Sequence, residues 1–328
     1  MAEIPAALAI IGPTATGKSS LALALARVLP AEIISMDSAM VYRGMDIGTA
    51  KPGTAERAAV PHHLIDIRSP DAAYSAAGFR QDCIRLVREI RARRRLPIIC
   101  GGTMLYYRAL LEGLSPVPGV SADVREHVRS ELAAHGVQAL HARLARLDPR
   151  AHAQLSAQDT QRVCRALEVC YATGRPLSHF QALPREPCPF AVHEVCLMPR
   201  DDRSDVRPLF RARFEQMLAA GLLGEVRTLV RLHALTAAHA ALRCVGYRQV
   251  YEHLCGTCGY QDMIERAVTA TARLAKHQMT WLRGGLRQAP RRCCLLPPGD
   301  EGNLQRLLEE LGGSGTGLHL DISNVIMH

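Results

Sequence analysis

Short apolar runs alternate with amphipathic segments in the first part of the chain and again past its middle. A strand that is covered on both faces is apolar throughout, so these runs predict buried strands. The runs cover residues 6–11, 31–36, 62–67, 96–100 and 192–198. Apolar positions spaced three and four apart predict helices between them, as in residues 75–95. This alternation indicates an α/β fold with a parallel sheet.

The middle of the chain has a different pattern. From residue 123 to residue 173, leucines and alanines recur at three- and four-residue intervals, which is typical of helices. Stretches rich in proline stand on either side of this region and are typical of domain borders. The predicted domains are a P-loop catalytic core at 1–115 and 190–300 and a helical insertion at 116–189.

Beyond residue 198 the pattern predicts helices alone, the longest at residues 260–283. The glycine-rich end of the chain, residues 312–328, is expected to be a disordered tail.

The first strand leads into a glycine loop, and the loop leads directly into a helix. The loop has the G-x-x-x-x-G-K-S pattern of a P-loop, in which glycines allow backbone N–H groups to converge on a phosphate. Lysine neutralises the outer phosphate, and the serine hydroxyl binds Mg²⁺. The P-loop residues are Gly12, Pro13, Thr14, Ala15, Thr16, Gly17, Lys18 and Ser19. We therefore predict a diphosphate or triphosphate site with Mg²⁺ on Ser19.

Polar residues follow two other predicted strands. Asp37 follows residues 31–36 and is expected close to the P-loop, because ligands of parallel sheets bind at the carboxyl ends of the strands. The strand at 96–100 ends in Gly101, Gly102 and Thr103. An ATPase or GTPase would carry a metal-holding aspartate there, so its absence argues against a hydrolase. The long polar loop at 42–52 is expected to contact substrate.

Composition and length favour a folded protein without membrane helices or disulfides. The chain has 328 residues, of which 48% are hydrophobic, so it can bury a core. No apolar stretch reaches the length of about 18 residues that a membrane helix needs, and no leader precedes the first strand, so we expect a cytoplasmic protein. Eleven cysteines in such a protein are expected to be thiols. A zinc site from the Cys255/Cys258 and Cys293/Cys294 pairs is disfavoured, because the second pair has the wrong spacing.

The net charge of +9 favours a polyanionic partner. Arg162 and Arg165 lie three residues apart near the start of a predicted helix, where the helix dipole does not favour cations. Basic residues also form a stripe along the predicted helix at 260–283, with Trp281 beside it. Such a stripe suits nucleic acid, although a solvated basic helix with a buried tryptophan fits the segment equally well.

Taken together, the motifs resemble the tRNA dimethylallyltransferases, also called tRNA isopentenyltransferases. The resemblance extends over about residues 8 to 285. The matching segments, in family order, are 12–19, 37–52, 101–103, 161–169, 243–248 and 276–283. Two positions depart from the family pattern: Met40 stands where many members have glutamine, and His277 replaces a common arginine.

The resemblance implies transfer of a dimethylallyl group from dimethylallyl diphosphate to N6 of adenosine 37 in tRNA. It places the diphosphate and Mg²⁺ in the P-loop and makes the Asp37 carboxylate the general base. Thr103 and Arg213 are implied beside the diphosphate or the reacting base. The insertion is implied to grip the anticodon stem-loop, and the protein to be a cytoplasmic monomer without a membrane segment. The implied tRNA-binding residues are Asp37, Ser38, Ala39, Met40, Thr103, Arg125, Gln161, Arg162, Arg165, Arg243, Cys244, Val245, Gly246, Tyr247, Arg248, Lys276, His277, Gln278, Trp281 and Arg283.

Two other functions remain open from the residues. In a small-molecule P-loop kinase, ATP would fill the loop and Asp37 would orient an acceptor hydroxyl. An RNA-binding protein with a vestigial phosphate site would bind tRNA without transferring a group.

Overall fold

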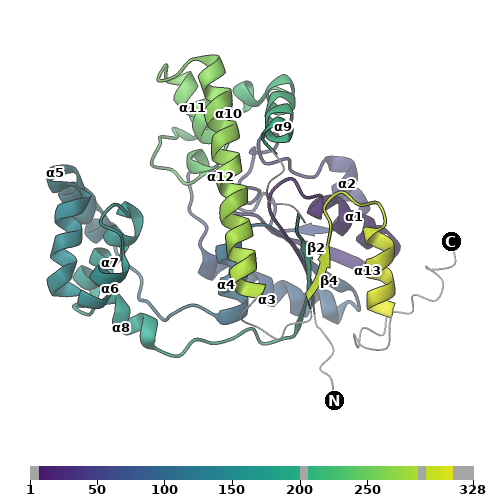
Figure 1. The fold of residues 1–328 in the computed structure, drawn as a ribbon, viewed down its shortest axis with the longest axis horizontal. Coiled ribbons are helices and arrows are strands. Elements are labelled where there is room, and N and C mark those ends of the chain that lie inside the picture. The colour runs from purple at the N-terminus through teal and green to yellow at the C-terminus, as the bar shows by residue number, and fades with distance from the viewer. Residues whose placement is uncertain (1–6, 200–205, 287–292, 313–328) are drawn as a thin grey trace. The chain divides into compact units, whose positions relative to one another are not determined.

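The computed structural model describes residues 7–199, 206–286 and 293–312 (Figure 1). It divides into two compact units. The first consists of Met1–Leu111 and Cys188–His328, and the second is Glu112–Pro187. Both borders lie within four residues of those expected from the proline-rich stretches.

A parallel sheet of six strands lies at the centre of the first unit, in the order β3-β2-β4-β1-β5-β6. The central strands are buried along their whole length, as their apolar runs predicted. Their bounds are β1 Ala7–Ile11, β2 Ala31–Met36, β3 His62–His63, β4 Leu96–Gly101, β5 Val192–Leu197 and β6 Cys293–Leu296.

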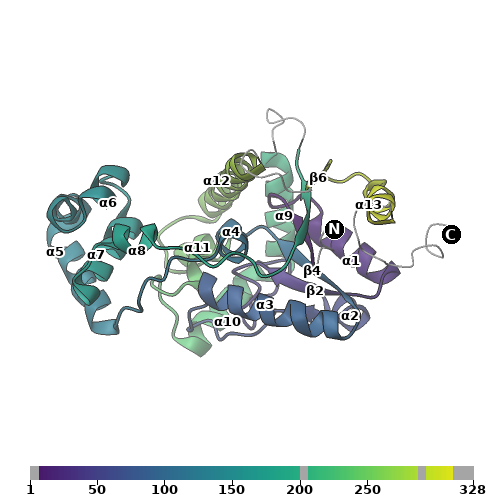
Figure 2. The ribbon, with the colours of Figure 1, turned by 90° about the horizontal axis from the view of Figure 1, so that it is seen from below.

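Helices cover both faces of the sheet. On one face, α1 (Lys18–Val28) and α13 (Asn303–Gly312) share an apolar cluster with β1, β2 and β4, and they lie side by side (Figure 2). On the other face, α3 (Ala76–Ala92) and α4 (Met104–Glu112) pack on the same strands. The short helix α2 (Thr54–Ala59) precedes β3. The sheet is thus buried between two layers, which explains its almost entirely apolar strands.

A third apolar cluster joins the C-terminal helices to the segment that follows β2. Phe210, Phe214 and Tyr247 from the helices pack with Val41 and Tyr42. The elements are α9 Arg207–Ala219, α10 Leu222–His233, the 3₁₀ helix η1 Ala241–Arg243, α11 Tyr247–Leu254 and α12 Tyr260–Leu286. This packing brings the C-terminal helices to the loops at the ends of the strands.

The second unit is wholly helical, as predicted. It contains α5 Ala122–Leu147, α6 Pro149–Gln154, α7 Thr160–Thr173 and α8 Leu177–Ala182. Helix α5 is broken at Gly136, whose φ of 73° glycine adopts at little cost. The buried Asp148 carboxylate caps two helices, since it accepts from the Ala151 N–H at 3.0 Å and the Ser178 N–H at 2.9 Å. The unit has its own core, centred on Leu140, Leu144 and Val163.

Three local predictions need correction. The chain after residue 198 is not wholly helical, because Cys293–Leu296 forms β6, a run too short to show a period. Helix α13 lies beyond the predicted core. Strand β3 has two residues where six were predicted, because residues 64 and 66 adopt positive φ. The predicted tail beyond residue 312 lies outside the described residues. Within the described part of the chain, no helix combines the length and apolar character that crossing a membrane requires.

Candidate active site

The carboxyl ends of three neighbouring strands meet at one edge of the sheet. Gly101 at the end of β4 pairs with Met36 of β2 on one side and with Ile11 of β1 on the other. The strands approach so closely that a Cβ on Gly101 would lie 2.2 Å from the Met36 carbonyl oxygen. Glycine at this position therefore brings the P-loop, Asp37 and Thr103 together. The position of Asp37 after a strand predicted its closeness to the P-loop, and the resemblance implied that of Thr103.

The P-loop has the backbone conformation of an anion cradle. Ala15 and Gly17 have φ of 62° and 83°, so successive N–H groups turn toward the same point. Gly12 is required by packing, because a Cβ there would lie 2.6 Å from the Leu197 carbonyl oxygen. The Thr16 hydroxyl donates to the Pro13 carbonyl at 2.9 Å and stabilises the turn. No side chain caps the start of α1, which leaves its first N–H groups available to an anion.

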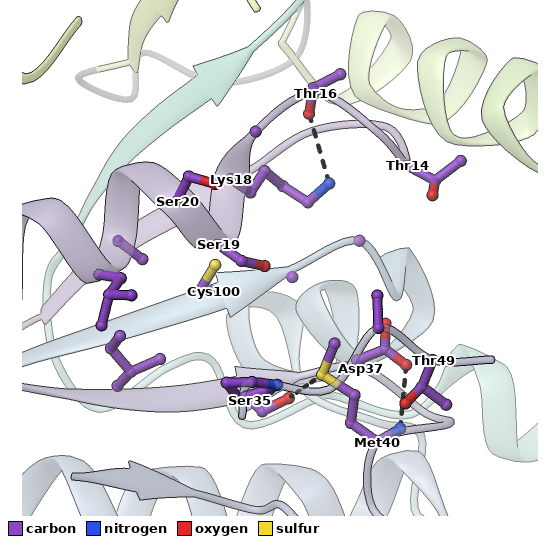
Figure 3. A pocket seen from close by; sticks show the side chains of 18 of the residues that line it. Thr14, Thr16, Lys18, Ser19, Ser20, Ser35, Asp37, Met40, Thr49 and Cys100 are labelled. Atoms are coloured by element: carbon purple, nitrogen blue, oxygen red, sulfur yellow. Dashed lines mark hydrogen bonds between the residues drawn. The ribbon is translucent and has the colours of Figure 1, made fainter. Parts of the chain in front are cut away.

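Lys18 and Ser19 enter the cavity from the P-loop side, whereas Asp37, Met40 and Thr49 enter from the opposite side (Figure 3). The Lys18 ammonium donates to the Pro13 carbonyl and lies 3.5 Å from the Thr16 hydroxyl oxygen. Burial lowers the pKa of Lys18, while the nearby Asp37 carboxylate acts in the opposite direction. An anion in the loop would replace the hydration that burial removes from this ammonium.

Asp37 and Thr103 both stabilise the turn that follows β2. Asp37 Oδ1 accepts from the Ala39 N–H at 2.8 Å and from the Met40 N–H at 3.4 Å, which fixes the turn after β2. Thr103 Oγ1 accepts from the Ser38 N–H at 3.0 Å. Among the described residues, none donates to Asp37 Oδ2. The second carboxylate oxygen is therefore available for a substrate.

Two cavities meet at Asp37. The first, of about 370 Å³, is lined by the P-loop and by the residues that follow β2 and β4. The second, of about 610 Å³, is lined largely by apolar and aromatic side chains, among them Phe210, Phe214 and Trp281. Asp37 and Arg213 line both. A phosphate compound in the first cavity and a flat aromatic group in the second would thus meet beside the carboxylate.

The loop at 42–52 is held by contacts within the protein, and Thr49 alone of its central residues lines both cavities. Glu225 on α10 accepts from the Asp46 N–H at 3.1 Å and the Ile47 N–H at 2.8 Å, and the Tyr247 hydroxyl donates to it. Lys51, whose side chain is 3% exposed, pairs with Asp46 and Asp66 at 2.6 Å each. The lysine charge is thus used to close the loop and does not face substrate.

We expect Glu225→Ala to destabilise the protein by about 1–3 kcal/mol, because it leaves the loop N–H groups and the Tyr247 hydroxyl without their acceptor. Urea denaturation followed by circular dichroism measures the change. Glu215→Ala is the matched control: Glu215 is an exposed helical glutamate whose ion pair with Arg211 spans 3.5 Å. Equal stability of the two variants would contradict this account of the loop.

The second cavity gathers most of the core residues that the resemblance assigned to tRNA. Its lining includes Ser38, Ala39, Thr103, Arg243, Cys244, Val245, Gly246, Tyr247, His277, Gln278 and Trp281. Met40 lines the first cavity instead, and its sulfur lies 3.7 Å from the Ser35 hydroxyl oxygen. Arg248 lines a neighbouring groove between α11 and α12. Lys276 and Arg283 are exposed on α12 and line none of these three hollows.

Several of the assigned residues are used within the protein. The Tyr247 ring is buried against the 42–52 loop, and a Cβ on Gly48 would lie 2.5 Å from it. The Gln278 amide binds the backbone of two active-site loops. Trp281 packs against the core and meets the Tyr107 ring edge-on at 6.4 Å between centroids. Trp281 is therefore half-buried: it packs against the core and also lines the second cavity.

Arg125, Gln161, Arg162 and Arg165 belong to the second unit. Arg125, Gln161 and Arg162 are exposed. Arg162 lies 3.5 Å from Asp159, the N-cap of α7, and Arg165 lies 3.3 Å from Glu168 on the same helix. The Arg162 guanidinium is exposed, and that of Arg165 is partly exposed, so both pairs contribute little to stability and leave the arginines able to exchange partners.

Sequence reasoning pointed to the 42–52 loop but did not single out Thr49 within it, and it missed Glu225 as the residue that holds this loop. Thr49 lies within the matching segment 37–52 but carries no signal of its own. Glu225 is spaced as a solvent-facing helical glutamate. Only its contact with a loop almost 180 residues earlier reveals its role.

The cysteines do not form a metal site within the described residues, and no disulfide joins those whose side chains are described. Cys255 is exposed and Cys258 half-buried. Cys100 lies beside Lys18 and Ser19 in the first cavity. Burial raises the pKa of the Cys100 thiol to about 11, so it is protonated near neutral pH.

Comparisons with known proteins agree with this geometry. The family model described as IPP transferase matches residues 40–285. A tRNA dimethylallyltransferase from Aromatoleum aromaticum is 53% identical over 281 residues, covering 85% of this chain and 87% of the relative. One from Neisseria gonorrhoeae is 47% identical over 307 residues, covering 93% and 96%.

Solved structures agree as well. The full-length tRNA isopentenylpyrophosphate transferase from Bacillus halodurans is 32% identical and has a TM-score of 0.63, covering 92% of this chain and 93% of its own. A eukaryotic dimethylallyltransferase, described as acting on tRNA, has a TM-score of 0.75 with 24% identity, covering 92% and 77%. At 24% identity, the second comparison shows a similar fold and nothing beyond the fold.

Proposed function

The chain belongs to the IPP transferase family, and we propose that, as a tRNA dimethylallyltransferase, it transfers the dimethylallyl group of dimethylallyl diphosphate to N6 of adenosine 37, next to the anticodon. The product is N6-isopentenyladenosine. The observation that carries this proposal is the position of Asp37 where a P-loop cavity and an apolar, aromatic cavity meet. This arrangement suits a reaction between a diphosphate ester and a nucleobase.

The reaction replaces one bond at C1 of the dimethylallyl group by another. The N6 lone pair attacks C1 and forms the C–N bond, while the C1–O bond breaks and its electron pair leaves with the diphosphate. The P-loop N–H groups and the Lys18 ammonium stabilise the negative charge that develops on this leaving group. Arg213 lines both cavities and can add a second positive charge at the point of transfer.

Asp37 is suited to be the general base. Its Oδ1 holds the turn after β2, while its Oδ2 is open to the cavities. As the C–N bond forms, N6 becomes acidic and its proton passes to this oxygen. Thr103 maintains the position of the carboxylate through the Ser38 N–H.

We propose Mg²⁺ as the cofactor of the diphosphate. The residues fit it: the Ser19 hydroxyl lines the P-loop cavity, the Asp37 carboxylate lies across it, and a P-loop metal takes its other ligands from phosphate and water. Within the described residues no protein cluster could hold a metal alone, which agrees with a metal that arrives with its phosphate. When bound, the metal neutralises charge on the leaving group.

The second cavity suits the adenine. A base reaches the carboxylate only if it leaves its stack, and the aromatic side chains of the cavity can replace that stacking. The unpaired anticodon loop makes extrusion of the base less costly than in a duplex.

The described cysteines whose side chains are placed are thiols and form no disulfides. This supports a location in a reducing compartment, the cytoplasm.

The deciding experiment incubates the protein with dimethylallyl diphosphate, ATP, Mg²⁺ and unmodified tRNA, followed by mass spectrometry of the nucleosides. We expect the mass of a dimethylallyl group on adenosine. Formation of ADP without this product would favour the kinase instead, and tRNA binding without either product would favour an RNA-binding protein.

We expect the second unit to contribute electrostatically to tRNA affinity. Replacing both Arg162 and Arg165 by alanine should flatten the slope of log affinity against log salt by roughly two, about one for each lost phosphate contact. Fluorescence titrations of an anticodon stem-loop at several salt concentrations measure the slope. Arg129→Ala serves as a control because Arg129 is an exposed arginine of the same unit that the resemblance does not assign to tRNA. An unchanged slope in the double variant would show that these arginines do not bind RNA.

A further inference from the structure

Gln278 is 8% exposed and uses both ends of its side-chain amide within the active site. Its Oε1 accepts from the Thr14 N–H at 2.9 Å, and its Nε2 donates to the Gly102 carbonyl at 2.8 Å. One side chain on α12 therefore joins the P-loop to the loop after β4.

The position of Gln278 on α12 explains how a shift of this helix at the second cavity can reach the P-loop. Ala275 and Leu282 lie three residues before it and four residues after it, and both are buried on the same face. His277 and Trp281 lie on the adjacent face and line the second cavity. The same helical turns thus contact the diphosphate loop on one side and the adenine cavity on the other.

The contact is tight enough to be sensitive to small shifts. A Cβ on Gly102 would lie 2.6 Å from Gln278 Nε2, so the amide rests directly on the glycine backbone. Thr14 and Gly102 also line both cavities. A change in the position of Gln278 therefore alters the direction of a P-loop N–H group at the junction of the cavities.

We propose that Gln278 is a positioning residue that couples RNA at the second cavity to the diphosphate loop, so that the two substrates bind cooperatively. The inference rests on the proposed function, because it takes the second cavity as the RNA side. A base held against His277 and Trp281 fixes this part of α12. Gln278 then holds the Thr14 N–H in the direction that an anion requires. By linkage, the diphosphate raises the affinity for RNA by the same factor.

The test measures binding without turnover. Isothermal titration calorimetry gives the affinity of the protein for inorganic diphosphate with Mg²⁺, alone and when saturated with an anticodon stem-loop RNA. For the unmodified chain we expect RNA to tighten diphosphate binding by about tenfold, within the usual range of coupling between sites. Gln278→Met, which keeps the length of the side chain and loses both hydrogen bonds, should reduce this factor to nearly one. Gln261→Met is the matched control, because Gln261 is exposed on the same helix, and it should keep the full factor.

A second variant separates the hydrogen bonds from packing. In Gln278→Glu the carboxylate can accept from the Thr14 N–H but cannot donate to the Gly102 carbonyl. The protonated acid can do both. We expect coupling to be weak near pH 8 and to recover, relative to the unmodified chain, as the pH falls through the pKa of this glutamate. A solely structural role would show no such recovery.

The proposal is overturned if the unmodified chain binds the two ligands independently. It is also overturned if Gln278→Met keeps the full coupling or if coupling in Gln278→Glu does not depend on pH. Because inorganic diphosphate does not react, these results are independent of group transfer. Product formation by the unmodified chain tests the proposed function separately.

Discussion

Asp37→Asn is expected to lower the rate of dimethylallyl transfer by about 10²- to 10⁴-fold, the usual contribution of a general base. The asparagine keeps an oxygen that can accept from the Ala39 N–H, so the turn after β2 should be preserved. It cannot take the proton from N6. The loss should therefore appear in the rate of a single turnover with saturating substrates, while tRNA affinity and thermal stability stay close to those of the unmodified chain.

Asp262→Asn provides the control for Asp37. Asp262 is an exposed carboxylate on α12 that pairs with Arg266 at 2.8 Å, away from both cavities. A normal single-turnover rate in the Asp37 variant would remove Asp37 from the mechanism. A parallel loss in both variants would point to a general electrostatic effect.

Lys18→Ala is expected to lower the transfer rate by about 10²- to 10³-fold, comparable with the loss of one group that stabilises a developing anion. The ammonium lies inside the P-loop, beside the Pro13 carbonyl, and has no part in the second cavity. The variant should therefore bind dimethylallyl diphosphate more weakly and tRNA almost normally. Separate titrations with each substrate measure the two affinities.

Lys276→Ala is expected to give the opposite result. Lys276 is exposed on α12 and lies outside the P-loop cavity, so its loss should weaken tRNA and leave the diphosphate unaffected. If Lys18→Ala weakened tRNA while the diphosphate affinity held, the assignment of the P-loop would be wrong.

The pH dependence of diphosphate binding provides a further readout for Lys18. Burial holds the pKa of this lysine below the ordinary value of 10.5. Only the protonated form attracts the anion, so affinity should begin to fall at a lower pH than for an ordinary lysine. Lys18→Ala should lose this part of the pH dependence.

The sequence by itself determined the α/β architecture of this protein and two parts of its active site, the P-loop and Asp37. Apolar runs identified the four longest strands, β1, β2, β4 and β5, because burial on both faces leaves a pattern that is local to each strand. The P-loop and Asp37 could be placed together because every strand of a parallel sheet carries its ligand loops at the same edge. The helical period of residues 123–173 predicted the second unit for the same local reason.

The tertiary structure alone decided which polar side chains are available to substrates and which hold the site together. Lysine, tyrosine and glutamine are typical of binding surfaces. Yet the side chains of Lys51, Tyr247 and Gln278 are buried, and their polar atoms bond to partners within the protein. Gln278 and the Thr14 N–H that it holds are 264 positions apart. Periodicity reports whether a position is buried, because burial repeats with the turn of its own helix. It carries no information about the partner, since a hydrogen bond between distant segments exists only after their packing has set the distance between the two atoms.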